Sequence, residues 1–268
     1  MDYLLLLFGG LLAGTVGSLV GLGGGIIIVP LLLGLGTLSS FPNISPQVAV
    51  GTSMISVVFT GLSSVLFYFK NKQVDVKSGM IFYLTSGPGA IFGAWINKFI
   101  YTNQFSLYFG VFMILVSVLL MIKKKIIPLK HSKQSTIIRT VTAPNGETFS
   151  YGINLIWALS ISFVVGVISG LFGIGGGSLL VPSMILLFSF PPQIAVATSM
   201  LVVFLSAILS SVTHITLGNV NWVYVLMLIP GALVGGKLGA IINNKLNDKV
   251  IISILRVILI IVGLRMIF

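Results

Sequence analysis

Hydroxyl groups, amides and backbone N–H groups are the side-chain and main-chain groups that could bind a substrate here, because carboxylates are scarce. The 268 residues contain four acids, Asp2, Asp75, Glu147 and Asp248, and none of them lies within a long apolar run. A charged side chain at the centre of a bilayer costs about 3 kcal/mol, so a carboxylate there would be a functional candidate. Carriers of cations and proton pumps usually need such an acid. Its absence favours a small anion or a neutral solute as the substrate.

One nine-residue motif carrying hydroxyls occurs twice, as PQVAVGTSM at 46–54 and as PQIAVATSM at 192–200. Proline suits the first position of a helix, so the hydroxyls are expected about 9 Å into each helix, at 1.5 Å per residue. They could donate hydrogen bonds to a substrate oxyanion, or they could bond to carbonyls of their own or neighbouring helices. These candidate substrate-binding residues are Thr52, Ser53, Thr198 and Ser199. Gln47 and Gln193 are expected near the mouth of the site, in a gating or supporting role.

A glycine cluster is also duplicated, as GLGGGIIIVP at 21–30 and as GIGGGSLLVP at 173–182. Glycine weakens a helix by about 1 kcal/mol per residue relative to alanine, so each cluster is predicted to break a helix that then restarts. A restarted helix presents unpaired N–H groups and the positive end of its dipole, which suit an oxyanion. The alternative is that the glycines only allow close helix packing. The candidate residues are Gly23, Gly24, Gly25, Gly175, Gly176, Gly177 and Ser178.

Other kinds of chemistry have few candidate residues. There is no cysteine, and the histidines are His131 and His214, so neither a protein-only metal cage nor a cofactor is expected. An enzyme would need a nucleophile and a base, and only His214 is a candidate base near the membrane, with no accompanying carboxylate. The chain is therefore not predicted to be an enzyme. His214 is instead a candidate for proton coupling.

The composition determines what kind of element positions these residues. The chain is 56% hydrophobic and 7% charged, with a mean hydropathy of +1.15, whereas soluble domains carry about 25% charged residues. This excludes an ordinary soluble enzyme and predicts a multi-pass helical protein of the cell (plasma or inner) membrane. The net charge is +11, and a connector at 123–150 carries six of the 15 lysines and arginines and one acid. It favours cytoplasmic anchoring and contact with anionic lipid rather than binding of nucleic acid.

Ten apolar segments are predicted, and two of them are short for a membrane crossing of about 20 residues. They cover residues 3–20, 24–38, 46–69, 78–99, 105–122, 151–172, 176–190, 192–215, 222–242 and 250–268. The first is expected to be a retained span rather than a cleaved signal. The segments 24–38 and 176–190 either cross as half-spans or re-enter the side they came from. The total is therefore about 8–10 transmembrane segments.

The two halves of the chain are homologous. The glycine clusters align at an offset of 152 residues and the PQ motifs at an offset of 146, and Pro88-Gly89-Ala90 matches Pro230-Gly231-Ala232 at an offset of 142. Pro88 and Pro230 are expected to kink a helix or to act as gating hinges. The predicted organisation is a first membrane repeat at 1–122, a basic cytoplasmic connector at 123–150 and a second membrane repeat at 151–268.

Loop charges favour inverted repeats. The loop at 69–77 carries three lysines and its counterpart at 214–221 has none, whereas the loop at 98–104 carries one and its counterpart at 243–249 carries two. If the connector is cytoplasmic, inversion places five of these lysines inside and one outside, as the positive-inside rule prefers. The predicted fold is therefore an all-α polytopic membrane protein, with two inverted repeats of about five segments and glycine-broken helices.

The duplicated GxGGGxxxVP, each copy followed by PQxAVxTS, resembles the TauE/SafE sulfite exporter family of membrane permeases over nearly the whole chain. The resemblance implies secondary transport of small sulfur-containing anions such as sulfite, thiosulfate or organosulfonates, with protons as a candidate coupling ion. The substrate-binding residues that the resemblance implies are the glycine and hydroxyl residues named above. The halves differ where Ile26 faces Ser178 and Gly51 faces Ala197, and Ser178 could add a hydroxyl to the second half. The alternatives are a transporter of another small anion or neutral metabolite, and a membrane subunit that does not transport.

Overall fold

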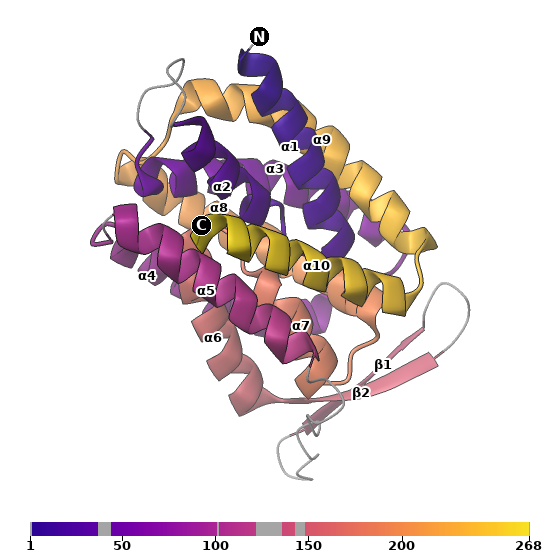
Figure 1. Ribbon diagram of the computed structural model, residues 1–268. Coiled ribbons are helices and arrows are strands. Elements are labelled where there is room, and N and C mark those ends of the chain that lie inside the picture. Colours follow the sequence, from indigo (N-terminus) through magenta and orange to yellow (C-terminus); the bar gives the residue numbers. More distant parts are fainter. Residues whose placement is uncertain (1, 37–43, 101, 122–135, 143–147, 268) are drawn as a thin grey trace.

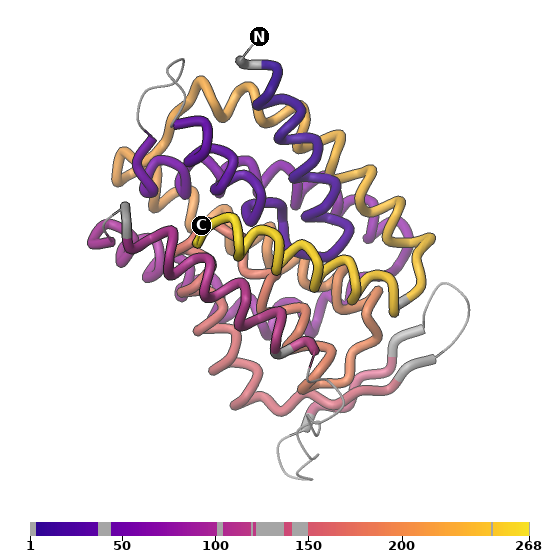
Figure 2. Tube along the Cα trace, viewed as in Figure 1, coloured from indigo at the N-terminus to yellow at the C-terminus, as the bar shows by residue number. Residues whose placement is uncertain are grey.

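The computed structural model describes residues 2–36, 44–100, 102–121, 136–142 and 148–267 (Figures 1 and 2). The lysines of the connector at 123–150 lie outside these residues. The described part of the chain forms ten helices and two strands. They are α1 (Asp2–Val20), α2 (Gly25–Leu35), α3 (Pro46–Lys70), α4 (Val76–Asn97), α5 (Thr102–Met121), β1 (Thr136–Thr142), β2 (Thr148–Asn154), α6 (Leu155–Phe172), α7 (Gly177–Leu187), α8 (Pro192–Thr216), α9 (Trp222–Lys245) and α10 (Asp248–Ile267).

The ten helices match the ten predicted apolar segments, which confirms an all-α polytopic membrane protein. Five helices in the described chain are long and apolar enough to cross a membrane, namely α3, α6, α8, α9 and the part of α10 from Lys249. The localisation is therefore a cell membrane that the chain crosses several times. The total of 8–10 crossings stays a prediction.

The helix starts follow from local sequence. Pro46 and Pro192 begin α3 and α8, as predicted. The carboxylate of Asp75 accepts a hydrogen bond from the N–H of Ser78 at the start of α4, and Asn221 caps α9 in the same way. Such caps satisfy N–H groups that have no partner within the helix.

The predicted helix breaks are confirmed at both glycine clusters. Gly24 precedes α2 with φ of 93° and Gly176 precedes α7 with φ of 79°, a left-handed conformation that glycine adopts without a steric penalty. Both helices have 11 residues, which is about 16 Å and half of a 30 Å hydrocarbon core. A Cβ added to Gly9 would lie 2.6 Å from Leu31, so α2 folds back along α1. Each of these helices is therefore shorter than the hydrocarbon core, and whether they cross as half-spans or re-enter stays a prediction.

The helices form two bundles that do not coincide with the two halves of the sequence. The first bundle consists of α1, α2, α3 and α9, and the second bundle consists of α6, α7, α8 and α4. Each half therefore contributes its fourth helix to the other half's bundle. The crossing of α3 and α8 joins the bundles, and α5 packs against α10 (Figure 1). Glycines allow these close contacts, as where Gly93 of α4 meets the Val167 carbonyl and Gly239 of α9 meets the Thr15 carbonyl.

The predicted match between Pro88 and Pro230 is wrong by one helical turn. Gly93 and Gly239 make equivalent contacts, so α4 and α9 correspond at the offset of 146 that also relates α3 and α8. Pro88 is then equivalent to Val234. Both prolines lie inside their helices and are exposed on the surface of the bundles. The register is determined by the small residues at the buried contact rather than by outward-facing prolines.

The equivalent helices α3 and α8 run antiparallel. Gly51 near the start of α3 lies beside His214 near the end of α8, and Gly61 in the middle of α3 lies beside Phe204 in the middle of α8. This is the relation that inverted repeats require. The orientation of each half relative to the cytoplasm stays a prediction.

One element was not predicted. The strands β1 and β2 pair antiparallel, with Arg139 opposite Tyr151, and form a hairpin in the second part of the connector (Figure 1). Because α6 begins at Leu155, residues 151–154 are strand rather than the start of a membrane segment.

Candidate functional site

The two glycine turns pack against each other at the crossing of the bundles. A Cβ added to Gly25 would lie 1.9 Å from the carbonyl oxygen of Gly173, and a Cβ added to Gly177 would lie 1.7 Å from that of Gly21. Only glycine permits this approach. Gly25 and Gly177 therefore allow close packing between the bundles, which was the alternative to a role in substrate binding. The same approach brings the starts of α2 and α7 together.

Two of the predicted hydroxyls connect the bundles at this point. Ser53 donates to the carbonyl of Gly173 over 3.0 Å, and the hydroxyl of Ser199 lies 3.1 Å from the carbonyl of Gly21 and 2.8 Å from that of Val196 in its own helix, so that its proton is shared between them. Both serines are fully buried. In this structure they bond to carbonyls of the opposite glycine turn, which was the alternative to substrate binding.

The two predicted threonines also hold backbone. Thr52 accepts from the N–H of Asn221 over 3.1 Å, and Thr198 accepts from the N–H of Asp75 over 3.0 Å. Each threonine thereby fixes the residue that caps α9 or α4 within its own bundle. Direct contact of these hydroxyls with a substrate stays a prediction.

Gln47 and Gln193 link the bundles at their two ends. The amide of Gln47 donates to the carbonyl of Ile100 over 2.8 Å and to that of Asn97 over 3.3 Å. The amide of Gln193 donates to the carbonyl of Leu246 over 3.0 Å. Because α3 and α8 are antiparallel, these two bonds lie at opposite ends of the bundle interface, where gates would lie.

The starts of α2 and α7 have N–H groups that no side chain caps. Gly24 and Gly176 make no side-chain cap, in contrast to Asp75 and Asn221. Gly23 and Gly175 come directly before Gly24 and Gly176 in the chain, and both lie against α3 and α8. Ser178 is 1% exposed, and its hydroxyl has no hydrogen-bond partner. The first N–H groups of a helix lack partners within it, so these buried starts can accept an anion.

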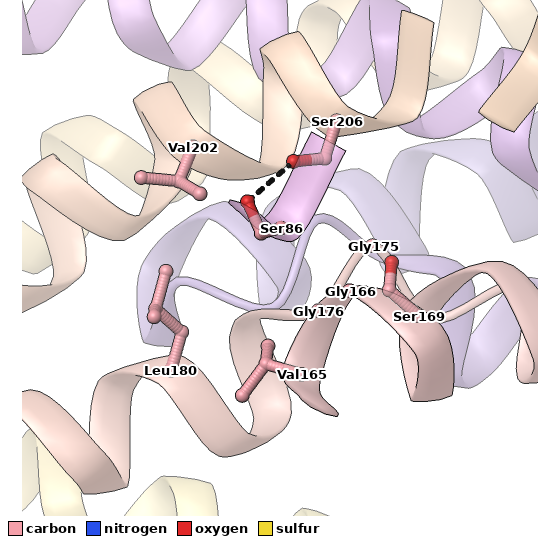
Figure 3. A pocket seen from close by; sticks show the side chains of 9 residues that line it. All are labelled: Ser86, Val165, Gly166, Ser169, Gly175, Gly176, Leu180, Val202 and Ser206. Atoms are coloured by element: carbon pink, nitrogen blue, oxygen red, sulfur yellow. Dashed lines mark hydrogen bonds between the residues drawn. The ribbon is translucent and has the colours of Figure 1, made fainter. Parts of the chain in front are cut away.

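A small cavity lies at the start of α7 (Figure 3). Its volume is about 10 Å³, roughly the space that one water molecule needs. It is lined by Ser86, Val165, Gly166, Ser169, Gly175, Gly176, Leu180, Val202 and Ser206. The hydroxyls of Ser86 and Ser206 are 2.9 Å apart, and that of Ser169 has no partner. Sequence reasoning missed these three serines because none of them belongs to a repeated motif.

A second missed cluster docks the connector hairpin onto the second bundle. Asp75, which is 4% exposed, accepts from Arg139 over 3.0 Å and from the Tyr151 hydroxyl over 2.6 Å. Burial alone would raise the pKa of Asp75, but hydrogen bonds from Arg139, Ser78 and Tyr151 outweigh it and hold the pKa below its ordinary value. Asp75 is therefore ionised at neutral pH and serves as the anchor of the hairpin.

We expect Asp75→Asn to release the hairpin at pH 7, because Arg139 and Tyr151 lose a charged acceptor and such bonds contribute about 1.5–3 kcal/mol. In the parent protein the docking should be complete above about pH 4, the unfolded pKa of an aspartate, and be lost as the pH falls through the lower folded pKa. A spin label on Ile138→Cys, at a side chain that is 73% exposed, would report the docking. Thr140→Ala, which removes a contact within the hairpin, should leave the label immobile. An immobile label in Asp75→Asn at pH 7 would contradict the anchoring role.

His214, the candidate for proton coupling, is fully buried near the end of α8. Its Nε2 lies 3.3 Å from the carbonyl of Gly170, and its Nδ1 has no partner. The equivalent residue of the first half is Tyr68, whose hydroxyl donates to the carbonyl of Ser18 over 3.0 Å. A buried histidine at one end of the molecule therefore takes the place of a buried tyrosine at the other end. A role for His214 in proton coupling stays a prediction.

Discontinuous helices that meet at the centre of a multi-pass helical protein are the architecture of a membrane transporter, or permease. Comparison with known proteins supports this class and narrows it. The family model described as "Sulfite exporter TauE/SafE" matches residues 6–266. The chain therefore belongs to the TauE/SafE sulfite exporter family.

Relatives cover the whole chain. It is 52% identical over 269 residues to the "Probable membrane transporter protein YunE" of Bacillus subtilis, covering 100% of this chain and 98% of that protein. It is 28% identical to a "Probable membrane transporter protein" of Xylella fastidiosa, covering 89% and 84%. An 88-residue match at 39% identity, covering 32% of this chain and 19% of the relative, is to "Sulfite exporter TauE/SafE family protein 5" of Arabidopsis thaliana. No solved structure matches the chain.

Proposed function

We propose that this transporter moves small sulfur-containing oxyanions, such as sulfite, thiosulfate or organosulfonates, across the cell membrane by alternating access. The observation that carries the proposal is the pair of uncapped helix starts, α2 and α7, buried together at the bundle interface. Backbone N–H groups at a helix start favour an oxyanion without the cost of a buried cation. The description of the family points to the same class of substrate.

The surroundings of these helix starts suit an anion. Among the described residues, the one acid recorded as buried is Asp75, and Arg139 neutralises it outside the helices. The polar groups around the turns are hydroxyls, which can donate to substrate oxygens. The candidate substrate-binding residues are Gly23, Gly24, Gly25, Thr52, Ser53, Gly175, Gly176, Gly177, Ser178, Thr198 and Ser199.

Alternating access follows from moving one bundle against the other. Contacts within a bundle, such as the bond from the Asn97 amide to the Leu171 carbonyl, can persist during this motion. Bonds between bundles must exchange, and four of these are made by Gln47, Ser53, Gln193 and Ser199. We propose that the glutamines hold the two gates and the serines hold the centre.

Counterflow in proteoliposomes tests the proposed substrate class. Vesicles preloaded with sulfite, thiosulfate or a small sulfonate are expected to accumulate the labelled anion when they contain the protein, and empty liposomes are not. The double variant Thr52→Ala/Ser199→Ala removes two of the predicted substrate-binding hydroxyls and should reduce uptake by tenfold or more, about 1.4 kcal/mol or above. Ser253→Ala removes an exposed hydroxyl of α10 and is the matched control.

Other outcomes would select the alternatives. If acetate, phosphate or an amino acid competes for uptake and the sulfur anions do not, the substrate is another small anion or metabolite. If the folded protein accumulates no anion and instead co-purifies with a stable protein, it is a non-transporting membrane subunit.

A further inference from the structure

We propose that the oxyanion binds in one bundle only, at the start of α7, where Ser86, Ser169 and Ser206 form a subsite for one of its oxygens. This inference rests on the proposed function and names the part of the molecule that would recognise its substrate. Three observations carry it: an unpaired buried hydroxyl, a donor pair that lines the same cavity, and the absence of equivalents of Ser86 and Ser169 in the other bundle.

The unpaired hydroxyl belongs to Ser169. The residue is 1% exposed, it lines the cavity, and its Oγ has no hydrogen-bond partner. A Cβ added to Gly176, the residue that precedes α7, would lie 3.4 Å from this Oγ. The hydroxyl therefore lies beside the uncapped helix start. A buried hydroxyl without a partner is unfavourable, and a ligand oxygen would satisfy it.

Ser86 and Ser206 supply a second donor. Their hydroxyls are 2.9 Å apart and come from α4 and α8, on another side of the cavity from Ser169 of α6 (Figure 3). When one of the two donates to the other, the proton of the second stays free. Three helices and the start of α7 thus direct donors at one space, and no carboxylate lines it. This donor set matches an oxyanion.

The first bundle lacks most of this set. At the offsets that relate the halves, Ser86 corresponds to Ala232 and Ser169 corresponds to Gly17, so two of the three hydroxyls are absent. Ser206 corresponds to Thr60, which is buried and also has no partner. Val202, which lines the cavity, corresponds to Ser56, which is buried and also has no partner. The start of α2 therefore offers backbone N–H groups and the hydroxyls of Ser56 and Thr60, whereas the start of α7 offers N–H groups and three hydroxyls in a different arrangement. The difference predicts one substrate subsite rather than two symmetric ones.

The size of the cavity indicates how the ligand is held. About 10 Å³ accommodates one oxygen atom or one water molecule, so the rest of the anion must lie outside it. Gly175 and Gly176 line the cavity, and their lack of side chains leaves the backbone open to a close approach. A sulfite or sulfonate, which carries several oxygens, can place one in the cavity, and separation of the bundles would admit the remainder.

Binding of sulfite to the purified protein, measured by calorimetry, tests the subsite. Ser169→Ala should weaken binding about tenfold, since a hydrogen bond to a charged group is lost. Thr60→Val is the matched control, because it removes a buried unpartnered hydroxyl in the first bundle, at the place that corresponds to Ser206. It should change the affinity by less than about twofold. Without ligand, Ser169→Ala should melt no lower than the parent, because no hydrogen bond is broken.

The possible results separate the subsite from the proposed function. If the parent binds and carries a sulfur anion while Ser169→Ala binds it equally well, the subsite is wrong and the proposed function stands. If Ser169→Ala and Thr60→Val weaken binding equally, the single subsite is wrong. If ligand-free Ser169→Ala melts markedly lower, the serine is structural. If the parent neither binds nor carries any sulfur anion, the proposed function fails, and this inference fails with it.

Discussion

Gly25→Ala is expected to abolish transport and to destabilise the protein by at least about 3 kcal/mol. The new Cβ would lie 1.9 Å from the carbonyl oxygen of Gly173, and both groups belong to backbone that is fixed by the bundle interface. Overpacking of a core typically costs 1–3 kcal/mol where side chains can move aside, and here no side chain can. Thermal unfolding in detergent and counterflow activity measure the two effects. Gly177→Ala should behave alike, since its Cβ would lie 1.7 Å from the Gly21 carbonyl.

Gly34→Ala is the matched control, because Gly34 lies in the same helix as Gly25. Its added Cβ would come no nearer than 3.4 Å, to the flexible end of Arg265. Alanine is the better helix former by about 1 kcal/mol, so this variant should be as stable as the parent or slightly more stable. Equal stability of Gly25→Ala and Gly34→Ala would show that the glycine turns do not need to touch.

Gln47→Ala and Gln193→Ala are expected to open opposite ends of the protein. Each substitution removes a bond between the bundles at one end only, to Ile100 or to Leu246. A hydrogen bond contributes about 1 kcal/mol, which is about a fivefold shift between two conformations. Alternating access then predicts that opening one end keeps the other end closed.

The absence of cysteine makes the measurement direct. Val50→Cys and Val196→Cys place reporters at equivalent, fully buried positions, one helical turn from each glutamine. Val50 packs against Gly173 and Val196 packs against Gly21, so both reporters lie at the bundle interface. Gln47→Ala should speed thiol labelling of the Val50 reporter about fivefold and slow that of the Val196 reporter, and Gln193→Ala should do the reverse.

A control and a contradicting result complete this test. Asn71→Ala removes an amide that bonds to the Phe67 carbonyl within the first half, and it should leave both labelling rates unchanged. Acceleration of both reporters by either glutamine variant would show that the interface loosens as a whole. In that case the glutamines would be structural contacts rather than gates.

Local features of the sequence determined the helices and their breaks. Apolar runs gave the ten segments because a chain in lipid must satisfy its backbone hydrogen bonds within each segment. Pro46 and Pro192 marked helix starts, and the glycine clusters marked breaks, because both effects depend on the residue's own backbone. The family and the class of membrane transporter also followed from the repeated motifs alone.

The tertiary structure alone decided which groups meet. Contacts with partners far away in the sequence place α4 and α9 in the bundle of the other half and align the two helices at an offset of 146 residues. Such contacts also bring Ser53 and Ser199 to the opposite glycine turns. The serine cavity and the anchor at Asp75 likewise combine residues from separate elements. In lipid, helices associate through close packing of small residues and interhelical hydrogen bonds rather than through hydrophobicity. Such packing requires two complementary helix surfaces, and the hydropathy of one segment does not show which other segment it packs against.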